Sequence, residues 1–536
     1  MPTRVPVTRL ALSAAIGGLC LLFASSTAAP LEKAPAPRVA PADLDKAIMA
    51  EIKARAEIMK NLEYLSDRIG GRLTGSANLE KANKWTAEKM RAYGLDNVRL
   101  EPWEIPYGWE RGTASMKLVE PDTGRSLLIA SAGWAPGTKG KVVGDVVILN
   151  AKTKDDLKAY KGKLKSAVIL RRPPTKVAPI LDANPPGGFG KKEEPKKEER
   201  PAPKGGDKKA DAKEQPKDQP RRGGFGGFDV QFQNDLREFL RAEGVACVVS
   251  DSGKPHGLLV TTGGWRGDRA AAEEGIASVY MAHEHYALLY RLASREKEPT
   301  RVEVEITNKF VPGPIVVYNT IGEVRGSEKP DEVVVVGAHL DSWDLATGTT
   351  DNGTGTCVVL ETARTIAALA KAGSPPRRTI RFCLFSGEEQ GLWGSKKYVE
   401  KYKNDLPKHS AALVHDTGTG KVTGFGLEGR ENVREIMEKE LAGLKDVEGW
   451  KGLTRGGIGA GTDHYPFHSE GVPGFACNQD MDEYRFTHHT QSDTFDKAKE
   501  PNLIQGAQVL AVTAVRVANL PELLPQKKIA RTRPGE

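Results

Sequence analysis

Residues 333–353 read VVVVGAHLDSWDLATGTTDNG, and this stretch decides the fold. The four valines predict a strand that is buried on both faces, because only an interior strand is apolar at successive positions. His339 and Asp341 follow at once, and Asp351 lies further along the loop. Ligands of open α/β sheets bind beyond the carboxyl ends of the strands, so a site is expected here. Two glycines allow the loop to fold back, which predicts that Asp351 lies near His339.

The chain around this stretch alternates between strand and helix patterns. TIRFCLFS and SAALVHD are typical of further strands, and helices are expected over about 355–370, 392–402 and 503–518. This alternation predicts an α/β fold with a mostly parallel central sheet and helices on both faces. Upstream, the apolar spacing predicts helices within 43–93. The second of these runs from about Ala77 to Tyr93, with Ser76 and Gly94 as its start and stop signals.

The 536 residues exceed one ordinary domain, so two folded domains with tails are expected. Between 111 and 298 the pattern changes to short strands with Gly/Pro turns, which predicts a β-rich domain inserted in the first one. Within it, residues 187–228 have mixed charge and few aliphatic side chains, which predicts a disordered loop. The expected order is a signal peptide 1–29, a linker 30–42, the first domain over 43–110 and 299–522, the insertion 111–298, and a tail 523–536.

The first 29 residues have the order of a secretory signal. Arg4 and Arg9 precede an apolar run over 10–23, and small residues lead up to Ala29. The apolar run is too short to span a bilayer stably. We therefore expect cleavage near Ala29 and a secreted or periplasmic protein without a stable membrane span. The alternative is an uncleaved anchor, whereas the residues before Cys20 fit a lipid-anchor signal poorly.

The charge and the cysteine content bear on possible binding partners and on disulfide bonds. The formal net charge is +8, and much of the excess lies in the low-complexity run, so no nucleic-acid partner is expected. The four cysteines beyond the signal segment are too sparse for a disulfide framework, and none has a CxxC neighbour. They are expected to be buried small hydrophobic residues, with a bridge left open. The oligomeric state is also open, with a homodimer as one option.

Three apolar strands end in acids or histidine, and the loop FTHHTQSD adds two more histidines. Several carboxylates in one pocket repel each other unless cations neutralise them. Imidazole and carboxylate ligands suit zinc. In a two-metal site one carboxylate can bridge the ions while a water is activated to attack a carbonyl. The candidate cluster comprises His339, Asp351, Glu388, Glu389, Asp416 and His489.

Roles within this cluster follow from the chemistry of adjacent groups. Of the neighbours Glu388 and Glu389, one can bind metal while the other takes a proton from the water. Asp351 is the candidate bridge, and Asp341 can accept the other ring N–H of His339 and fix its tautomer. Each motif alone has a plainer explanation, such as a capped turn or first-turn charge at a helix. Their recurrence at three strand ends favours a site.

As an ordered set, HLDSWDLATGTTDNGTG, FSGEEQGLWGS, HDTGTG, TDHYPF and HHTQSDTFD resemble the co-catalytic dizinc exopeptidases, a family of zinc aminopeptidases and glutamate carboxypeptidases. The SWD after HLD and the HHT form of the last motif are most like the glutamate carboxypeptidase type. The resemblance covers about residues 61–519. Over 111–298 the chain resembles a protease-associated domain, a β-rich insertion of secreted exopeptidases.

The resemblance implies two Zn²⁺ ions and a role for each matching residue. Glu388 is implied as the general base and Asp341 as the residue that orients a ligand. His488 falls where several relatives place a tyrosine that helps the oxyanion, and His464 either lines the pocket or has a structural role. The implied metal ligands are His339 and Asp416 for one ion, Glu389 and His489 for the other, and Asp351 as the bridge.

The implied activity is hydrolysis of a terminal peptide bond in short peptides or dipeptides. Carboxypeptidase or dipeptidase specificity and aminopeptidase specificity are both open, because an arginine would anchor a free carboxylate and an acid a free ammonium. A rival of another class is a non-catalytic binding ectodomain on the same scaffold, which should lack ligands, whereas all six positions are filled here. The candidate anchors are Arg455, Arg485, Asp480, Asp482 and Glu483.

Overall fold

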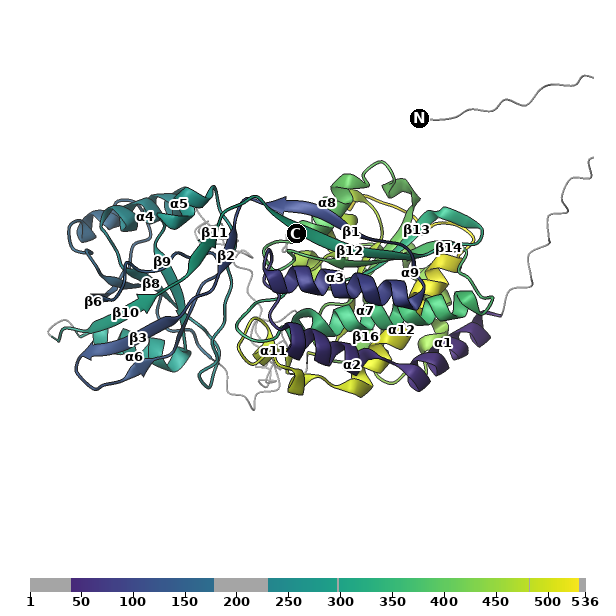
Figure 1. Cartoon of the computed structure of the whole chain (residues 1–536), viewed down its shortest axis with the longest axis horizontal. Coiled ribbons are helices and arrows are strands. Elements are labelled where there is room, and N and C mark those ends of the chain that lie inside the picture. The colour runs from purple at the N-terminus through teal and green to yellow at the C-terminus, as the bar shows by residue number, and fades with distance from the viewer. Residues whose placement is uncertain (1–39, 178–229, 296–297, 482, 530–536) are drawn as a thin grey trace, which may run out of the picture. The chain divides into compact units, whose positions relative to one another are not determined.

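The computed structural model describes residues 40–177, 230–295, 298–481 and 483–529 (Figure 1). The predicted signal peptide and the predicted disordered loop lie outside these residues. Within the described ranges, no helix combines the length and the apolar character that a bilayer span requires.

The central sheet has eight strands and is mixed. Its middle strands β14, β13, β15 and β18 are parallel, as expected, whereas β12, β1 and β16 join antiparallel to their neighbours. The prediction of a mostly parallel sheet therefore holds only for the middle of the sheet. In spatial order the strands are β1 (Asp96–Ile105), β12 (Ile315–Val324), β14 (Arg378–Phe385), β13 (Lys329–His339), β15 (His409–Val414), β18 (Gly474–Gln479), β16 (Val422–Gly426) and β17 (Gly452–Thr454).

Helices cover both faces of this sheet, as the sequence predicts. Val334 and Val336 of β13 pack into a core with α7 (Thr354–Lys371) and α12 (Glu500–Asn519). Their neighbours Val333 and Val335 point to the opposite face, because side chains alternate along a strand. That face is covered by α8 (Trp393–Lys401) and α10 (His464–Glu470), and the first face also by α1 (Pro41–Arg55), α2 (Ile58–Glu63) and α3 (Ala77–Tyr93).

The start and stop signals predicted for the second N-terminal helix are confirmed. Helix α3 begins after Ser76, whose Oγ accepts a hydrogen bond from Leu79 N at 3.2 Å. It ends at Gly94, which has a φ of +84°. A side-chain oxygen satisfies a free N–H at the first turn, and only glycine adopts the left-handed conformation at the end without strain.

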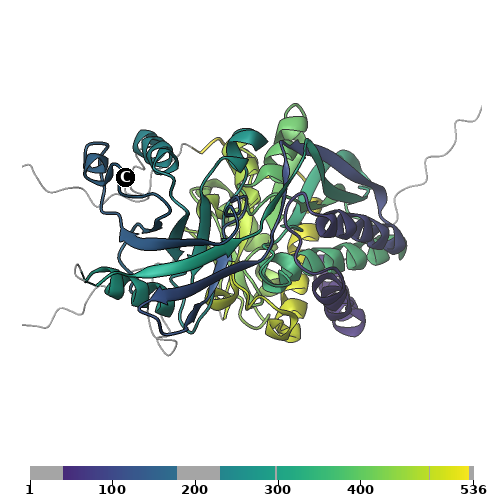
Figure 2. The ribbon, with the colours of Figure 1, turned by 60° about the vertical axis from the view of Figure 1, so that its left-hand side comes forward.

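A second eight-stranded sheet is built mainly from the predicted insertion (Figure 2). The boundary expected at 298/299 is wrong, because β10 (Arg301–Ile306) pairs with β3 and β6 of this sheet. Its residues alternate between buried and half-buried, which is typical of a strand with one solvated face. The other strands are β3 (Ala114–Glu120), β4 (Ser126–Leu127), β5 (Ile129–Ser131), β6 (Val142–Ile148), β7 (Val168–Leu170), β8 (Cys247–Asp251) and β9 (Ala277–Met281), with helices α4 (Val230–Ala242), α5 (Arg269–Glu273) and α6 (His283–Ala293).

The four cysteines of the described residues are free and buried, as predicted. Burial raises the pKa of Cys247 and of Cys357 to about 12. A thiol with such a pKa stays protonated at neutral pH and packs as a small apolar side chain.

Candidate metal centre

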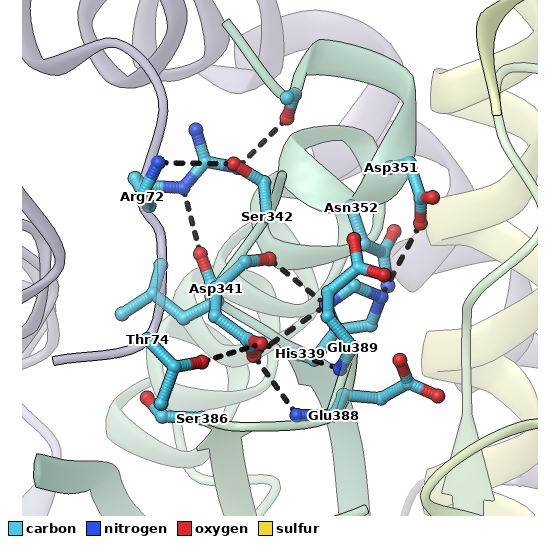
Figure 3. Close-up of polar contacts among 12 residues, drawn as sticks. Arg72, Thr74, His339, Asp341, Ser342, Asp351, Asn352, Ser386, Glu388 and Glu389 are labelled. Carbon is cyan, nitrogen blue, oxygen red and sulfur yellow. Dashed lines mark hydrogen bonds and ion pairs between the residues drawn. The ribbon is translucent and has the colours of Figure 1, made fainter. Parts of the chain in front are cut away.

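The site lies at one edge of the central sheet, where three parallel strands end (Figure 3). His339 is the last residue of β13, Glu388 and Glu389 follow β14, and Asp416 follows β15. Because these strands are parallel neighbours, their carboxyl ends meet at the same edge. His489 reaches the same place from the loop after α11 (Tyr484–Thr487).

One group of ligand atoms surrounds the imidazole of His339. Its Nε2 lies 3.0 Å from Asp416 Oδ1 and 3.4 Å from Asp351 Oδ1. These three side chains are almost fully buried, and their ligand atoms lie within 4.8 Å of one another. The loop after β13 therefore folds back and brings Asp351 to His339.

A second group surrounds the imidazole of His489. Its Nε2 lies 2.9 Å from Glu389 Oε2 and 3.5 Å from Asp351 Oδ2. The ring of His488 stacks on that of His489 with centroids 3.7 Å apart, and its Nε2 lies 4.0 Å from Asp351 Oδ2. Both histidines thus approach the carboxylate, but only His489 also contacts Glu389 among the ion pairs of the described residues.

Asp351 links the two groups, since each of its carboxylate oxygens faces a different imidazole. Asp493 fixes the loop that carries Asp351: its carboxylate accepts hydrogen bonds from Thr350 N at 2.5 Å and Asp351 N at 3.1 Å. Sequence reasoning did not single out Asp493, although it is the last residue of the FTHHTQSD loop.

Asp341 differs from its predicted role. The Nδ1 of His339 lies 2.9 Å from the main-chain oxygen of Asp341 and 3.7 Å from its carboxylate. The carboxylate instead accepts hydrogen bonds from Glu388 N at 3.2 Å and Glu389 N at 3.3 Å (Figure 3). The carboxylate of Asp341 thus lies near the ring, but the main-chain oxygen of the same residue is its nearer partner. The main-chain oxygen of Asp341 orients the ring of His339, and the carboxylate holds the turn that carries both glutamates.

Burial and neighbouring carboxylates disfavour the charged forms of the two glutamates of the cluster. Burial raises the pKa of Glu388 well above its ordinary value; the charge of His339 opposes this, and those of Asp416 and Asp463 add to it. Burial and the charge of Asp351 likewise raise the pKa of Glu389. Carboxylates in one buried pocket stay ionised only if cations neutralise them.

The donor set fits divalent metals such as zinc. Asp351 Oδ2 and Glu389 Oε1 are buried and have no hydrogen-bond partner among the described residues. Buried oxygens without a partner are costly in a folded protein. Imidazole nitrogens and carboxylate oxygens in this arrangement are the ligands that catalytic zinc uses.

Arg72 supports the loop behind the site and was not foreseen. Its guanidinium is fully buried and donates to three main-chain oxygens after β13, those of Leu340 at 2.7 Å, Thr347 at 2.8 Å and Gly348 at 2.7 Å. These contacts join a segment before α3 to the loop that carries Asp341 and Asp351. No local pattern in the sequence announces a pairing across more than 260 residues.

His464 is fully buried, and its Nε2 lies 3.2 Å from Glu428 Oε2. This contact indicates a structural role for His464. The neighbouring Asp463 accepts a hydrogen bond from Ser395 Oγ at 2.5 Å, and burial raises its pKa to about 7.

Comparisons with known proteins agree with this geometry. The profile of peptidase family M28 matches residues 319–514, a stretch that runs from β12 into α12 and contains every residue of both groups. The chain is a metallo-exopeptidase, a hydrolase, which confirms the resemblance drawn from the motifs. It is similar to carboxypeptidase Q from mouse, at 27% identity over 91% of both chains, and from human, at 27% identity over 88% of both.

Solved structures share the fold. The peptidase M28 precursor of Shewanella amazonensis has a TM-score of 0.68 at 23% identity, over 91% of this chain and 99% of that one. BSAP, a zinc aminopeptidase from Bacillus subtilis, has a TM-score of 0.56 at 20% identity, over 85% and 93% of the two chains. At this identity the likeness concerns the mixed α/β architecture.

Proposed function

We propose that this protein is a secreted or periplasmic zinc exopeptidase that hydrolyses a terminal peptide bond of short peptides or dipeptides with a water activated at a two-metal site. The observation that carries the proposal is the position of Asp351, whose two oxygens lie 3.4 Å and 3.5 Å from the imidazoles of His339 and His489. A carboxylate between two ligand groups is the arrangement that a bridged pair of ions requires.

The two groups divide the ligands between two Zn²⁺ ions. His339 and Asp416 would hold one, Glu389 and His489 the other, and Asp351 both. When bound, the ions act as Lewis acids and lower the pKa of a coordinated water. With an ion bound, a hydrogen bond from His339 Nδ1 to the main-chain oxygen of Asp341 would leave Nε2 free to face the ion.

Glu388 moves the proton in this proposal. Its carboxylate leaves the turn in a different direction from that of Glu389 (Figure 3). Among the described residues, the hydrogen bond of Glu388 to Asp341 comes from its main-chain N–H, and its carboxylate oxygens form no hydrogen bond or ion pair. Glu388 takes one proton from the attacking water and gives it to the nitrogen of the departing amine as the peptide C–N bond breaks. His488, half-exposed and stacked on His489, is proposed to donate an N–H to the developing oxyanion.

The similar proteins support this function. Carboxypeptidase Q indicates the reaction type, and the Bacillus subtilis protein BSAP, a zinc aminopeptidase, indicates the metal. A secreted location is proposed from the composition of residues 1–29.

Removal of metal tests the proposal. The protein purified with zinc should release free amino acids from dipeptides, and a chelator followed by buffer exchange should abolish the release. Added Zn²⁺ should restore it, whereas Mg²⁺ should not, because the imidazole ligands favour zinc. Activity that survives complete removal of metal would contradict the proposal.

A further inference from the structure

Residues 252–262, which follow β8 of the second sheet, contact the loop that carries His488 and His489. Thr261 N donates to the main-chain oxygen of His489 at 3.0 Å. Leu259 N donates to Gln491 Oε1 at 2.5 Å, and Val260 forms a β-bridge with Thr490. The segment is therefore held at its start by β8 and along its length by the loop that carries the two histidines.

Lys254 lies on this segment, and its amine has no acidic partner among the described residues. Its Nζ donates to the main-chain oxygen of Arg485. Within the part of the chain that the structure describes, Lys254 takes part in no ion pair. A half-buried ammonium normally pairs with an acid, because its desolvation is otherwise uncompensated.

The charge of Lys254 acts on the metal centre. Burial lowers the pKa of Lys254, and the negative charge of Asp351 raises it. A positive group therefore sits beside a site that is itself proposed to hold two cations. An anion brought by the substrate would relieve this repulsion.

We propose that Lys254 Nζ binds the free α-carboxylate of the substrate and thereby makes the enzyme a carboxypeptidase or dipeptidase. The inference rests on the proposed function and names the terminus on which that site acts. In a substrate cleaved at its last peptide bond, only the leaving nitrogen and one Cα separate the scissile carbonyl from the carboxylate. A cation next to the metal ligands is therefore well placed to receive it.

Of the other candidate anchors, Asp480 and Arg455 interact with groups elsewhere, and Asp482 lies outside the described residues. Asp480 pairs with Lys451 at 3.6 Å and is half-exposed. Arg455 acts electrostatically on Glu431, near the start of α9 (Arg434–Glu440). Arg485 contributes its main-chain oxygen to Lys254.

Two measurements on the zinc-loaded full chain test this. The first is the binding, by calorimetry, of an uncleavable dipeptide isostere with a free or an amidated C-terminus. The second is kcat/KM for the matching dipeptide and dipeptide amide. The variants are Lys254→Met, which keeps the length of the side chain, and Lys254→Arg, which keeps the charge. Lys309→Met, at an exposed lysine of β11 (Lys309–Val311), is the matched control.

Lys254→Met should weaken binding of the free-carboxylate isostere by about 10–100-fold, the range of a charge-assisted hydrogen bond. It should leave binding of the amide unchanged, raise KM more than it lowers kcat, and be partly rescued in Lys254→Arg. The control should behave as wild type. If Lys254→Met weakens the binding of the free-carboxylate and the amidated isostere equally, or of neither, the inference is overturned. Wild-type protein that binds both isosteres but cleaves neither dipeptide would instead overturn the proposed function.

Discussion

Glu388→Gln should abolish nearly all turnover while both metals stay bound. Glutamine has the size of glutamate but cannot accept a proton at neutral pH. The backbone hydrogen bond from Glu388 N to the Asp341 carboxylate is unchanged by the substitution. A positioned general base contributes about 10²–10⁴-fold to a rate. We therefore expect kcat to fall by about that factor and KM to change little, since Glu388 is not among the proposed ligands.

Steady-state kinetics with a dipeptide, together with metal analysis of the same sample, measure this result. Glu400→Gln is the matched control, because Glu400 is an exposed residue of α8 that pairs only with Lys397 among the described residues. A Glu388→Gln enzyme that retains wild-type kcat would remove the proton-transfer role. One that loses its metals would make Glu388 a ligand instead.

Asp351→Asn should cost the protein both metal and activity. The change keeps the shape of the side chain but removes the charge that both imidazole groups face. The loss should exceed the roughly 10–100-fold reduction in metal affinity or activity that follows removal of a group hydrogen-bonded to a ligand. It should affect both ions, because one carboxylate serves both groups.

A calorimetric titration of Zn²⁺ into the metal-free variant measures the affinities for the two ions. Asp446→Asn, at an exposed aspartate, controls for a change of charge, and circular dichroism checks that each variant is folded. If the variant binds one Zn²⁺ with normal affinity and fails to bind the second, Asp351 is a ligand of one ion and does not bridge.

The sequence predicted the part of the site that depends on local pattern. The valine run of β13 and the apolar runs of β14 and β15 mark buried strands, and parallel strands bring their ends to one edge. The gathering of His339, Glu388, Glu389 and Asp416 at this edge follows from the pattern alone, whereas the choice of Glu389 as the ligand came from the resemblance. The predicted caps of α3 were right for the same reason, since a cap depends on a few neighbouring residues.

Contacts between distant segments escaped prediction. Arg72 binds main-chain oxygens after β13, and Lys254, in the segment after β8, reaches Arg485 of α11. Strand β10 was assigned to the wrong sheet, because alternation shows that a strand is half-buried but not which strand it pairs with. For Asp341, spacing placed the residue beside His339 but did not decide whether its carboxylate or its main-chain oxygen contacts the ring.

The metal content of the purified wild-type chain tests the central claim most directly. Protein dialysed against metal-free buffer after loading with zinc should hold about two zinc ions per chain by elemental analysis, as a site with a bridging carboxylate requires. A value of one or less, in protein that still hydrolyses dipeptides at full rate, would contradict a two-metal site.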